Sequence, residues 1–493
     1  MEARKLYLGI DVGTQGTRVI IADQDGRVVT ETSQEFHPFS KPTALPEGWF
    51  QQSPDFWWEA TRAALAQSIA NLSFLGYRAA DIDALSATST SGTVLAIDRD
   101  YHPLRDAIMY NDSRAAAEAE TIQAGAADLT RKLGYRFNAS FGLPKMLWLV
   151  RNAPEVSSQT YKFIHAGDYI LGKICGYFET TDYTNALKSG YDVADFRWPE
   201  FIETELGIPL EKLPRVLPPG EIIQPVSKTC AAETGLAATT RVVLGMTDGC
   251  ASQVASGAVR PGTWNTTIGT TLVIKGVTER LLTDPGGSIY CHRHPEGYWM
   301  PGGASNVGGD CLEIHFRREE FASLNKQIAG NGPSGILVYP LQKTEERYPI
   351  RKTGITGFIV GEARNRAELY QGYLEGVGLV ERLAYDLITR MGGRLGERVY
   401  VAGGAAKSLE WLKIRAAILN KILFKPKIVG AHMGAAILAA SKTYYTSLGE
   451  AASRMVKPEL EVHPETDRLE PYQAKYEQFL AELKRRGYLE ELC

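Results

Sequence analysis

The stretch LYLGIDVGTQGTRVIIADQDGRVVTE, residues 6–31, contains three apolar runs that are separated by two polar turns. The runs are rich in β-branched and aliphatic residues, which predicts three short strands. Asp25-Gly26 is a hairpin signal between the second and third runs. The first turn therefore joins two antiparallel strands rather than a strand and a helix. The three runs are Leu6–Asp11, Arg18–Ala22 and Arg27–Thr30.

The first turn, residues 13–17, combines small residues with a preceding acid, Asp11. Phosphate binds where backbone N–H groups converge and small residues allow close approach, and this turn offers both. A carboxylate at a strand end can hold Mg²⁺ directly or through water. The same D-x-G-T pattern also occurs in ordinary tight hairpins. The turn alone leaves phosphate, metal and a plain hairpin open.

Length, net charge and amino-acid composition indicate which class of protein this chain belongs to. The chain has 493 residues, a formal net charge of −3 and 44% hydrophobic residues, which suits a large globular protein of two to four domains. The balanced charge gives no sign of a nucleic-acid or membrane partner. Six scattered cysteines without zinc-ligand spacing predict reduced core residues and a cytoplasmic location.

A second Gly/Thr turn, at 269–271, again lies between β-rich runs, so the two halves show a weak twofold echo. Strand-rich starts followed by helical patterns predict two α/β domains with a border near residue 250. A nucleotide site needs a second phosphate contact and a shelf for adenine. TIGTT (Thr267–Thr271) can supply the contact, and AGGAAKS (Ala402–Ser408) can supply the shelf, although each is an ordinary glycine loop by itself.

One competing motif is rejected. Residues 167–173 fit G-x-x-x-x-G-K, the start of a Walker A loop, but Ile174 stands where Ser or Thr should contact Mg²⁺. The intervening residues are bulky and typical of a helix, so they cannot fold back around an anion.

Taken in order, several segments resemble the FGGY family of carbohydrate kinases. GIDVGTQGTR is joined by segments similar to the family's W-x-D-x-R-A, K-x-x-W-L, catalytic-Asp and adenosine motifs, and the resemblance covers nearly all of residues 5–445. The matching segments are YNDSRA (110–115), KMLWLVRN (145–152), GMTDGCAS (245–252), VAGGAAKSLEW (401–411) and MGAAILAA (433–440).

The resemblance implies an α/β fold of two actin-like (ribonuclease H-like) domains that flank a deep ATP and sugar cleft. It places an N-terminal kinase domain for sugar and phosphate binding at 5–250. A C-terminal kinase domain for nucleotide binding follows at 251–445, with a helical tail at 446–493.

The implied reaction transfers the γ-phosphoryl group of ATP to a sugar hydroxyl, with Mg²⁺ bridging the phosphates. Asp248 is the expected general base and also a sugar contact, although its position before a helix is equally typical of an N-cap. Asp11 is the expected Mg²⁺ residue. The expected ATP-binding residues are Gly13, Thr14, Gln15, Thr17, Gly269, Thr270, Thr271, Gly403, Gly404 and Ser408.

Substrate choice depends on residues 89–93, Ser-Thr-Ser-Gly-Thr. The family's xylulokinases usually have G-Q-M-H-G here, and its glycerol kinases have N-Q-R-E-T. A hydroxyl-rich turn can still bind a polyol, with Thr90 and Ser91 as the expected contacts. Together with DYTNALKSGYD (182–192), the turn looks like a small branch that phosphorylates D-ribulose. We therefore expect a ketopentose, D-ribulose first and D-xylulose second.

Other classes remain open at this stage. A catalytically silent actin-fold sensor would bind nucleotide without needing Asp248, and another polyol could be the substrate. An Hsp70-like ATPase would need a peptide-binding domain, whereas the chain ends in a charged helical pattern. The expected partner is a small sugar, with no nucleic acid or membrane, and a homodimer is left open.

Overall fold

The structure is a computed structural model that describes residues 5–36, 45–284 and 287–489. The chain divides into two compact units, and both are discontinuous in sequence. The first unit comprises 1–259, 292–297 and 428–457, and the second comprises 260–291, 298–427 and 458–493. The two compact units do not coincide with the linear domains predicted at 5–250, 251–445 and 446–493, and those boundaries stay a prediction.

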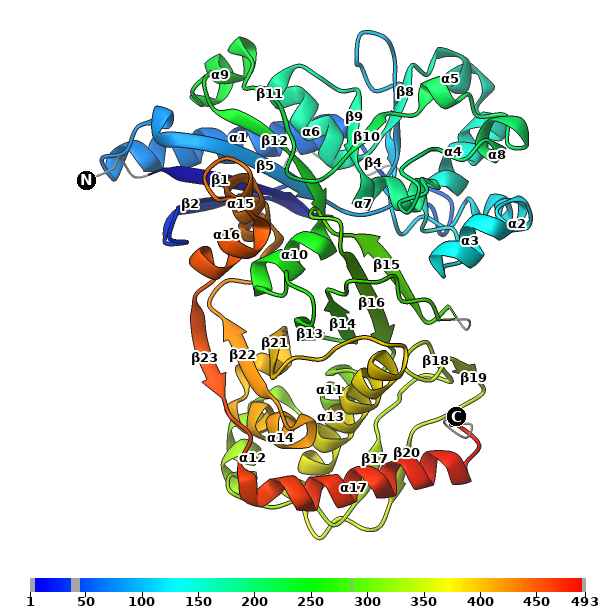
Figure 1. Cartoon of the computed structure of the whole chain (residues 1–493), viewed down its shortest axis with the longest axis vertical. Coiled ribbons are helices and arrows are strands. Elements are labelled where there is room, and N and C mark those ends of the chain that lie inside the picture. The colour runs from blue at the N-terminus through cyan, green and yellow to red at the C-terminus, as the bar shows by residue number, and fades with distance from the viewer. Residues whose placement is uncertain (1–4, 37–44, 285–286, 490–493) are drawn as a thin grey trace. The chain divides into compact units, whose positions relative to one another are not determined.

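The first unit is built on a six-stranded sheet of order β11-β12-β5-β1-β2-β3 (Figure 1). The central strands β1, β5 and β12 run parallel, and the outer pairings are antiparallel. Parallel strands covered on both faces read as continuous apolar runs, which explains the fully buried LYLGI of β1. The strands are β1 (Leu6–Val12), β2 (Gly16–Asp23), β3 (Val28–Glu35), β5 (Ile82–Ser89), β11 (Ile222–Pro225) and β12 (Arg241–Thr247).

The second unit repeats this plan in a seven-stranded sheet of order β15-β16-β14-β13-β21-β22-β23. Here β13, β21 and β22 are parallel, and the β13–β14 hairpin corresponds to the β1–β2 hairpin. The predicted α/β class and the twofold echo are thus confirmed. The strands are β13 (Trp264–Ile268), β14 (Leu272–Gly276), β15 (Ile289–Arg293), β16 (Trp299–Ser305), β21 (Arg398–Ala402), β22 (Ile422–Pro426) and β23 (Pro458–Val462).

Helices and short strands complete each unit. In the first unit the helices are α1 (Pro54–Phe74), α2 (Ala116–Gly125), α3 (Ala127–Leu133), α4 (Gly142–Asn152), α5 (Pro154–Gln159), α6 (Ala166–Cys175), α7 (Tyr183–Ala186), α8 (Phe201–Thr204), α9 (Lys228–Thr234), α10 (Asp248–Ser256), α15 (Ala431–Ser441) and α16 (Leu448–Met455). Its short strands are β4 (Gln51–Gln52), β6 (Leu95–Ile97), β7 (Ala107–Ile108), β8 (Lys162–Ile164), β9 (Thr180–Asp182) and β10 (Arg215–Leu217).

In the second unit the helices are α11 (Asp310–His315), α12 (Phe321–Ile328), α13 (Arg366–Arg390), α14 (Leu409–Leu419) and α17 (Thr466–Arg485). Its short strands are β17 (Leu337–Tyr339), β18 (Glu345–Glu346), β19 (Lys352–Thr353) and β20 (Phe358–Val360).

Helix α15 returns late in the sequence to pack on the first sheet. It lies against β1, β2, β5, β12 and α10, and all of its residues are buried. Two glycines permit this approach: a Cβ at Gly9 would lie 1.8 Å from the His432 carbonyl oxygen, and one at Gly434 would lie 1.9 Å from that of Ala251. The strand that carries Asp11 and the helix that begins at Asp248 therefore share one packing partner.

Residues 167–173 lie within helix α6 and are mostly buried. A continuous helix presents no loop of N–H groups, so the rejection of a Walker A loop is confirmed.

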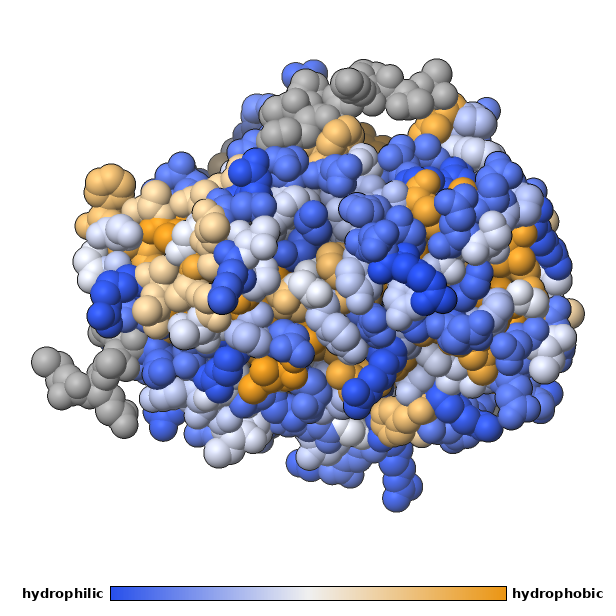
Figure 2. Space-filling model, turned by 90° about the horizontal axis from the view of Figure 1, so that it is seen from above, coloured by the Kyte–Doolittle hydropathy of each residue, from blue (hydrophilic) through white to orange (hydrophobic). Residues whose placement is uncertain are grey.

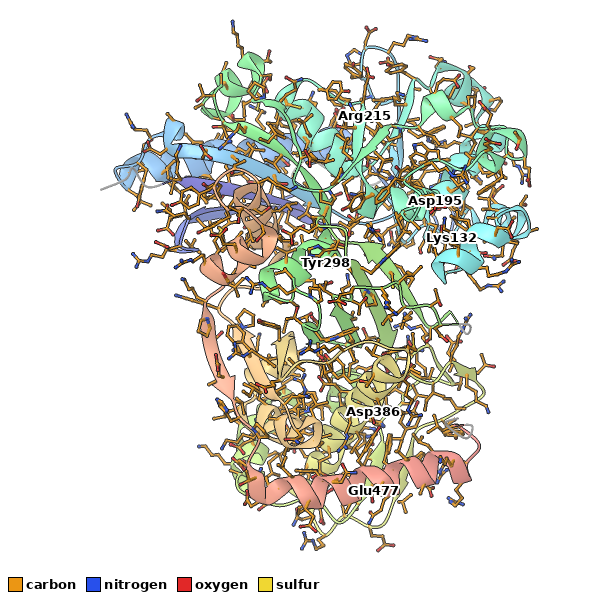
Figure 3. The ribbon with its side chains drawn as sticks, in the orientation of Figure 1. Lys132, Asp195, Arg215, Tyr298, Asp386 and Glu477 are labelled. Carbon is orange, nitrogen blue, oxygen red and sulfur yellow. The ribbon has the colours of Figure 1, made fainter. Side chains whose placement is uncertain are left out.

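Side-chain pairs tie distant segments within each unit (Figure 3). In the first unit, Lys132 of α3 forms ion pairs of 2.7 Å with Asp192 and Asp195, which anchors the segment after α7. In the second, Tyr476 of α17 donates a 2.5 Å hydrogen bond to Asp386 of α13. The charged helix predicted near the end of the chain is thus part of the second unit.

Within the described residues, no helix is both long and apolar enough to cross a membrane. The face of the molecule in Figure 2 is largely hydrophilic, with hydrophobic side chains in small scattered groups. The five described cysteines are free thiols, four of them buried, as the sequence predicts.

Candidate active site

Three predicted site segments meet at one edge of the first sheet. Val12 of β1 and Thr247 of β12 both pair with Ser89 of the intervening strand β5. Because the three strands are parallel, their carboxyl ends lie side by side, and ligands of open α/β sheets bind at such edges. Asp11, the turn at residues 89–93 (the 89–93 turn) and Asp248 are therefore brought together.

Asp248 is the first residue of helix α10, directly after β12. The N-cap is Thr247, and the Asp248 carboxylate accepts a 2.6 Å hydrogen bond from the N–H of Gly249. Asp248 follows the N-cap residue and bonds the helix backbone locally, and its role as the general base stays a prediction. A carboxylate in the first helical turn interacts favourably with the helix dipole.

A buried network fixes the backbone beside Asp248. The N–H of Thr247 donates to the hydroxyl of Thr184 at 3.0 Å, and that hydroxyl donates to the carboxylate of Asp182. The same carboxylate accepts bonds from the backbone and side-chain amides of Asn185. Burial raises the pKa of Asp182 to about 6. The first turn of α10 is thus held by side chains of α7.

Asp11 lies in an unfavourable environment for a charge. Burial and the nearby Asp248 carboxylate raise its pKa from 3.8 to about 7, while Arg18, directly opposite on β2, lowers it. Its Oδ1 atom is buried and has no hydrogen-bond partner among the described residues. Two neighbouring carboxylates with an unsatisfied oxygen are what a hard divalent cation requires, so these residues fit Mg²⁺.

The first turn leaves its tip exposed. Gly13 N–H donates to the Gly16 carbonyl at 3.0 Å, and the Thr14 carbonyl accepts a 2.7 Å bond from Gln52. Thr14 and Gln15 are exposed at the end of the hairpin, where a phosphate could approach them.

The Thr17 side chain points away from the tip of the turn, and the ATP contact predicted for this residue stays a prediction. Its hydroxyl is buried 3.2 Å from that of Thr61 on α1. Strand alternation is the reason: Arg18 pairs with Asp11 on one face of the sheet, so Thr17 points to the other face.

The 89–93 turn is rich in hydroxyls with different roles. The Thr90 and Thr93 hydroxyls are 2.8 Å apart and close the turn, whereas Ser91 Oγ is buried without a hydrogen-bond partner among the described residues. Ser91 is therefore the better placed of the two predicted sugar contacts.

Two further polar residues belong to the segments that the sequence singled out for substrate choice, but neither was predicted as a contact. Ser89 Oγ and Asn185 Oδ1 are buried and also lack hydrogen-bond partners within the described part of the chain. The D-x-T-N pattern at 182–185 could have indicated the turn of α7. Nothing in the sequence could have shown which oxygen atoms remain unsatisfied.

The second unit contains a cavity of about 730 Å³ that gathers predicted nucleotide residues. Gly269, Thr270, Gly404 and Ser408 line it, and Tyr370 and Trp411 are among the residues that add aromatic surface. Thr271 is not among the lining residues. Gly403 lies beside the cavity with a φ of +85°, and its Cβ would lie 2.3 Å from the Ile268 carbonyl oxygen, so it shapes the turn.

Polar groups in this cavity are ordered. Asn325 Oδ1 accepts bonds from the Tyr370 hydroxyl at 3.3 Å and from the Ser408 hydroxyl at 3.2 Å. Ser408 also caps helix α14. A half-open cavity with aromatic surface and a few fixed polar groups suits a planar heterocycle.

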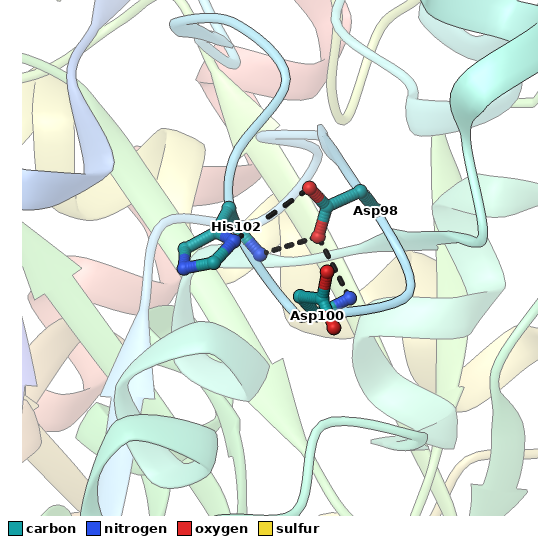
Figure 4. A group of neighbouring side chains, drawn as sticks. All are labelled: Asp98, Asp100 and His102. Atoms are coloured by element: carbon teal, nitrogen blue, oxygen red, sulfur yellow. Dashed lines mark hydrogen bonds and ion pairs between the residues drawn. The ribbon is translucent and has the colours of Figure 1, made fainter.

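Asp98, Asp100 and His102 form a separate acidic group on an exposed loop (Figure 4). Asp98 Oδ1 already accepts the N–H groups of residues 100 and 102, both at 2.9 Å. This arrangement is that of an ordinary Asx turn, and the three side chains carry no assignment.

Comparison with known families agrees with this geometry. The FGGY family of carbohydrate kinases, N-terminal domain, matches residues 6–255, and its C-terminal domain matches residues 258–443. The chain belongs to this family, and it is a sugar kinase, a phosphotransferase of a family that uses ATP as co-substrate.

Curated relatives span nearly the whole chain. A xylulose kinase of Bacillus subtilis is 28% identical over 96% of this chain and 95% of its own length. A xylulose kinase of Escherichia coli is 26% identical over 96% and 98%, and a gluconokinase of Bacillus subtilis is 24% identical over 91% and 90%.

Solved structures share the fold. A xylulose kinase from Rhodospirillum rubrum superposes with a TM-score of 0.85 at 23% identity, covering 98% of this chain and 99% of its own. A gluconate kinase from Lactobacillus acidophilus gives 0.82 at 22% identity, covering 98% of each chain. The fold is therefore the actin-like ATPase fold of FGGY kinases.

Proposed function

We propose that this sugar kinase phosphorylates a ketopentose, D-ribulose first, to give D-ribulose 5-phosphate. One observation carries the proposal: Asp11, Asp248 and the 89–93 turn lie at the shared carboxyl edge of three adjacent parallel strands. This register supports the proposal that a charge site, a base and a hydroxyl-rich turn serve one small molecule.

Asp248 is the proposed general base. It accepts the proton of the attacking sugar hydroxyl, so that the oxygen can bond to phosphorus as the bond from the γ-phosphorus to ADP breaks. The N-terminus of α10 contributes N–H groups that stabilise negative charge at the same place.

Asp11 is the residue proposed to hold Mg²⁺, with the exposed tip of the first turn beside the phosphates. When bound, Mg²⁺ neutralises phosphate charge. The tip of the first turn is proposed to contact phosphate mainly through the backbone groups of Gly13, Thr14 and Gln15. Thr14 and Gln15 are exposed, and Gly13 has no side chain.

The cavity of the second unit is proposed to hold the adenosine. Gly404 and Ser408 lie at the strand–helix junction that follows β21, and Gly269 with Thr270 is proposed to contact phosphate. The order of motifs and the cavity lining both support this assignment.

The 89–93 turn is proposed to select the sugar. The turn contains Ser91, whose hydroxyl is buried without a partner among the described residues, and it contains no charged side chain, so recognition proceeds through hydrogen bonds to neutral hydroxyls. A carboxylate substrate such as gluconate would find no positive partner in this turn itself. A neutral polyol fits it better.

D-Xylulose is the second candidate, because the 28% and 26% identical relatives are named xylulose kinases. D-Ribulose and D-xylulose differ only in configuration at one carbon. The hydroxyl pattern of the 89–93 turn favours D-ribulose through its likeness to the ribulose-phosphorylating branch.

The test is ADP release with Mg-ATP against D-ribulose, D-xylulose, L-ribulose, L-xylulose, ribitol, glycerol and D-gluconate. We expect the highest kcat/KM with D-ribulose. Asp248→Ala should lower kcat by about 10²–10⁴, the usual contribution of a general base. Asp100→Ala, which removes an exposed carboxylate of the same unit, should retain full activity.

A higher kcat/KM with D-xylulose would show that D-xylulose, not D-ribulose, is the preferred substrate, and Asp248 would remain the proposed base. An unchanged kcat in Asp248→Ala would remove Asp248 from the mechanism. Turnover of gluconate alone would overturn the ketopentose proposal.

A further inference from the structure

A buried lysine holds the 89–93 turn from behind. Lys145 lies in the first turns of α4, and its side chain is completely buried. Its Nζ donates to the Gly92 carbonyl at 3.0 Å and to the Phe141 carbonyl at 3.3 Å. One ammonium group thus joins the middle of the turn to the start of a helix.

Burial of the Lys145 ammonium group destabilises the folded protein. The pKa of Lys145 is lowered to about 7, chiefly by burial and then by the charge of Lys188, and the nearby Asp112 carboxylate offsets this only in part. Taking a charge out of water costs free energy that two neutral carbonyls repay incompletely. An apolar side chain of the same length would fill the space without that cost.

The turn also packs against the segment that precedes α4. Gly92 has a φ of +88°, and a Cβ there would lie 2.2 Å from the Ser140 carbonyl oxygen, so the backbone packs directly on the segment before α4. The hydrogen bond between the Thr90 and Thr93 hydroxyls holds the turn together internally, so the turn can move only as a unit. Lys145 restrains that freedom.

We propose that Lys145 is a positioning residue for the sugar: by holding the Gly92 carbonyl it sets the place of the Ser91 hydroxyl. Lys145 does not touch the reacting atoms. This inference rests on the proposed function, in which the 89–93 turn contacts the sugar.

The test compares Lys145→Met, which keeps the length of the side chain and removes its donors, with the wild type. We expect the KM for the best sugar of the panel to rise about 10-fold or more, because small displacements of binding groups are costly. The KM for ATP should stay within about twofold, since the predicted adenosine residues lie in the other unit.

A matched control separates positioning from stability. Lys162 also donates from Nζ to two carbonyls of the same unit, those of Glu211 at 2.6 Å and Leu213 at 3.1 Å, but on β8 rather than at the turn. Lys162→Met should lower the melting temperature and leave the sugar KM unchanged. KM does not depend on the fraction of folded enzyme, so partial unfolding cannot imitate the effect.

Ser91→Ala separates the proposed sugar site from the positioning role of Lys145. If Ser91→Ala raises the sugar KM and Lys145→Met does not, the positioning role is wrong and the proposed sugar site stands. If neither variant changes the sugar KM, the sugar site at this turn is wrong. Should Lys145→Met not fold, Lys145→Gln replaces it, and an unchanged sugar KM there would overturn the positioning role.

Discussion

At the scale of single residues, the stability of the protein conflicts with the role proposed for Asp11. Its pKa of about 7 in the folded protein lies above its unfolded value of 3.8. Between these values the folded chain binds the proton that the unfolded chain has released. The free energy of unfolding therefore falls as the pH rises from about 4 to about 7.

We predict that Asp11→Asn stabilises the nucleotide-free protein at pH 8 and abolishes its kinase activity. A pKa change of this size corresponds to about 4 kcal/mol, which is the upper bound of the gain. The gain should shrink toward pH 4, where Asp11 is neutral in the folded protein and only partly ionised in the unfolded chain. Urea denaturation at pH 4.5 and pH 8 measures it.

Asp128→Asn is the control, because its side chain is 98% exposed and should behave alike at both pH values. An Asp11→Asn protein that is equally destabilised at pH 4.5 and pH 8 would contradict the charge argument. It would point instead to a lost contact.

At the scale of elements, helix α15 decides where α10 lies. Gly434 of α15 meets the backbone of Ala251 on α10, one turn after Asp248. Because a methyl group there would collide with a backbone carbonyl, the helices must move apart.

We predict that Gly434→Ala destabilises the protein by about 1–3 kcal/mol and lowers kcat through displacement of α10. Thermal unfolding and steady-state kinetics check both effects. Gly125→Ala is the matched helical control, since its Cβ would meet only the flexible end of the Glu205 side chain. If both variants behave alike, the close approach of the helices is not important for activity.

Element boundaries show where local signals were sufficient. The predicted strands at 6–11, 18–22 and 27–30 correspond to β1, β2 and β3. Other helix starts and strand pairings depend on contacts with distant segments. Helix α4 begins at Gly142, three residues before the segment KMLWLVRN (145–152), and helix α10 follows strand β12 directly. The strands on either side of the 89–93 turn pair with β1 and β12 and with β8, not with each other.

At the scale of the whole molecule, the chain interleaves its two units. Residues 428–457 return to the first unit and bring it α15, which contacts four of its sheet strands. Every residue of α15 is buried, so its removal would expose a large apolar area.

We predict that a fragment of residues 1–259 does not fold alone. It should aggregate or bind a hydrophobic dye, with broad amide NMR signals, because the face of β1 and α10 that α15 covers would meet water. The full chain is the control. A cooperative melting transition of this fragment would show that the first unit is stable without α15.

The sequence determined the first three strands, the glycine turns, the family and the choice of Asp11 and Asp248 as candidate site residues, because these depend on local patterns and on motif order. The tertiary structure decided which groups work together. The register of β1, β5 and β12 brings the carboxylates to one edge and turns Thr17 away from it. Burial, which local sequence does not encode, leaves Ser91 unsatisfied, raises the pKa of Asp11 and encloses Lys145.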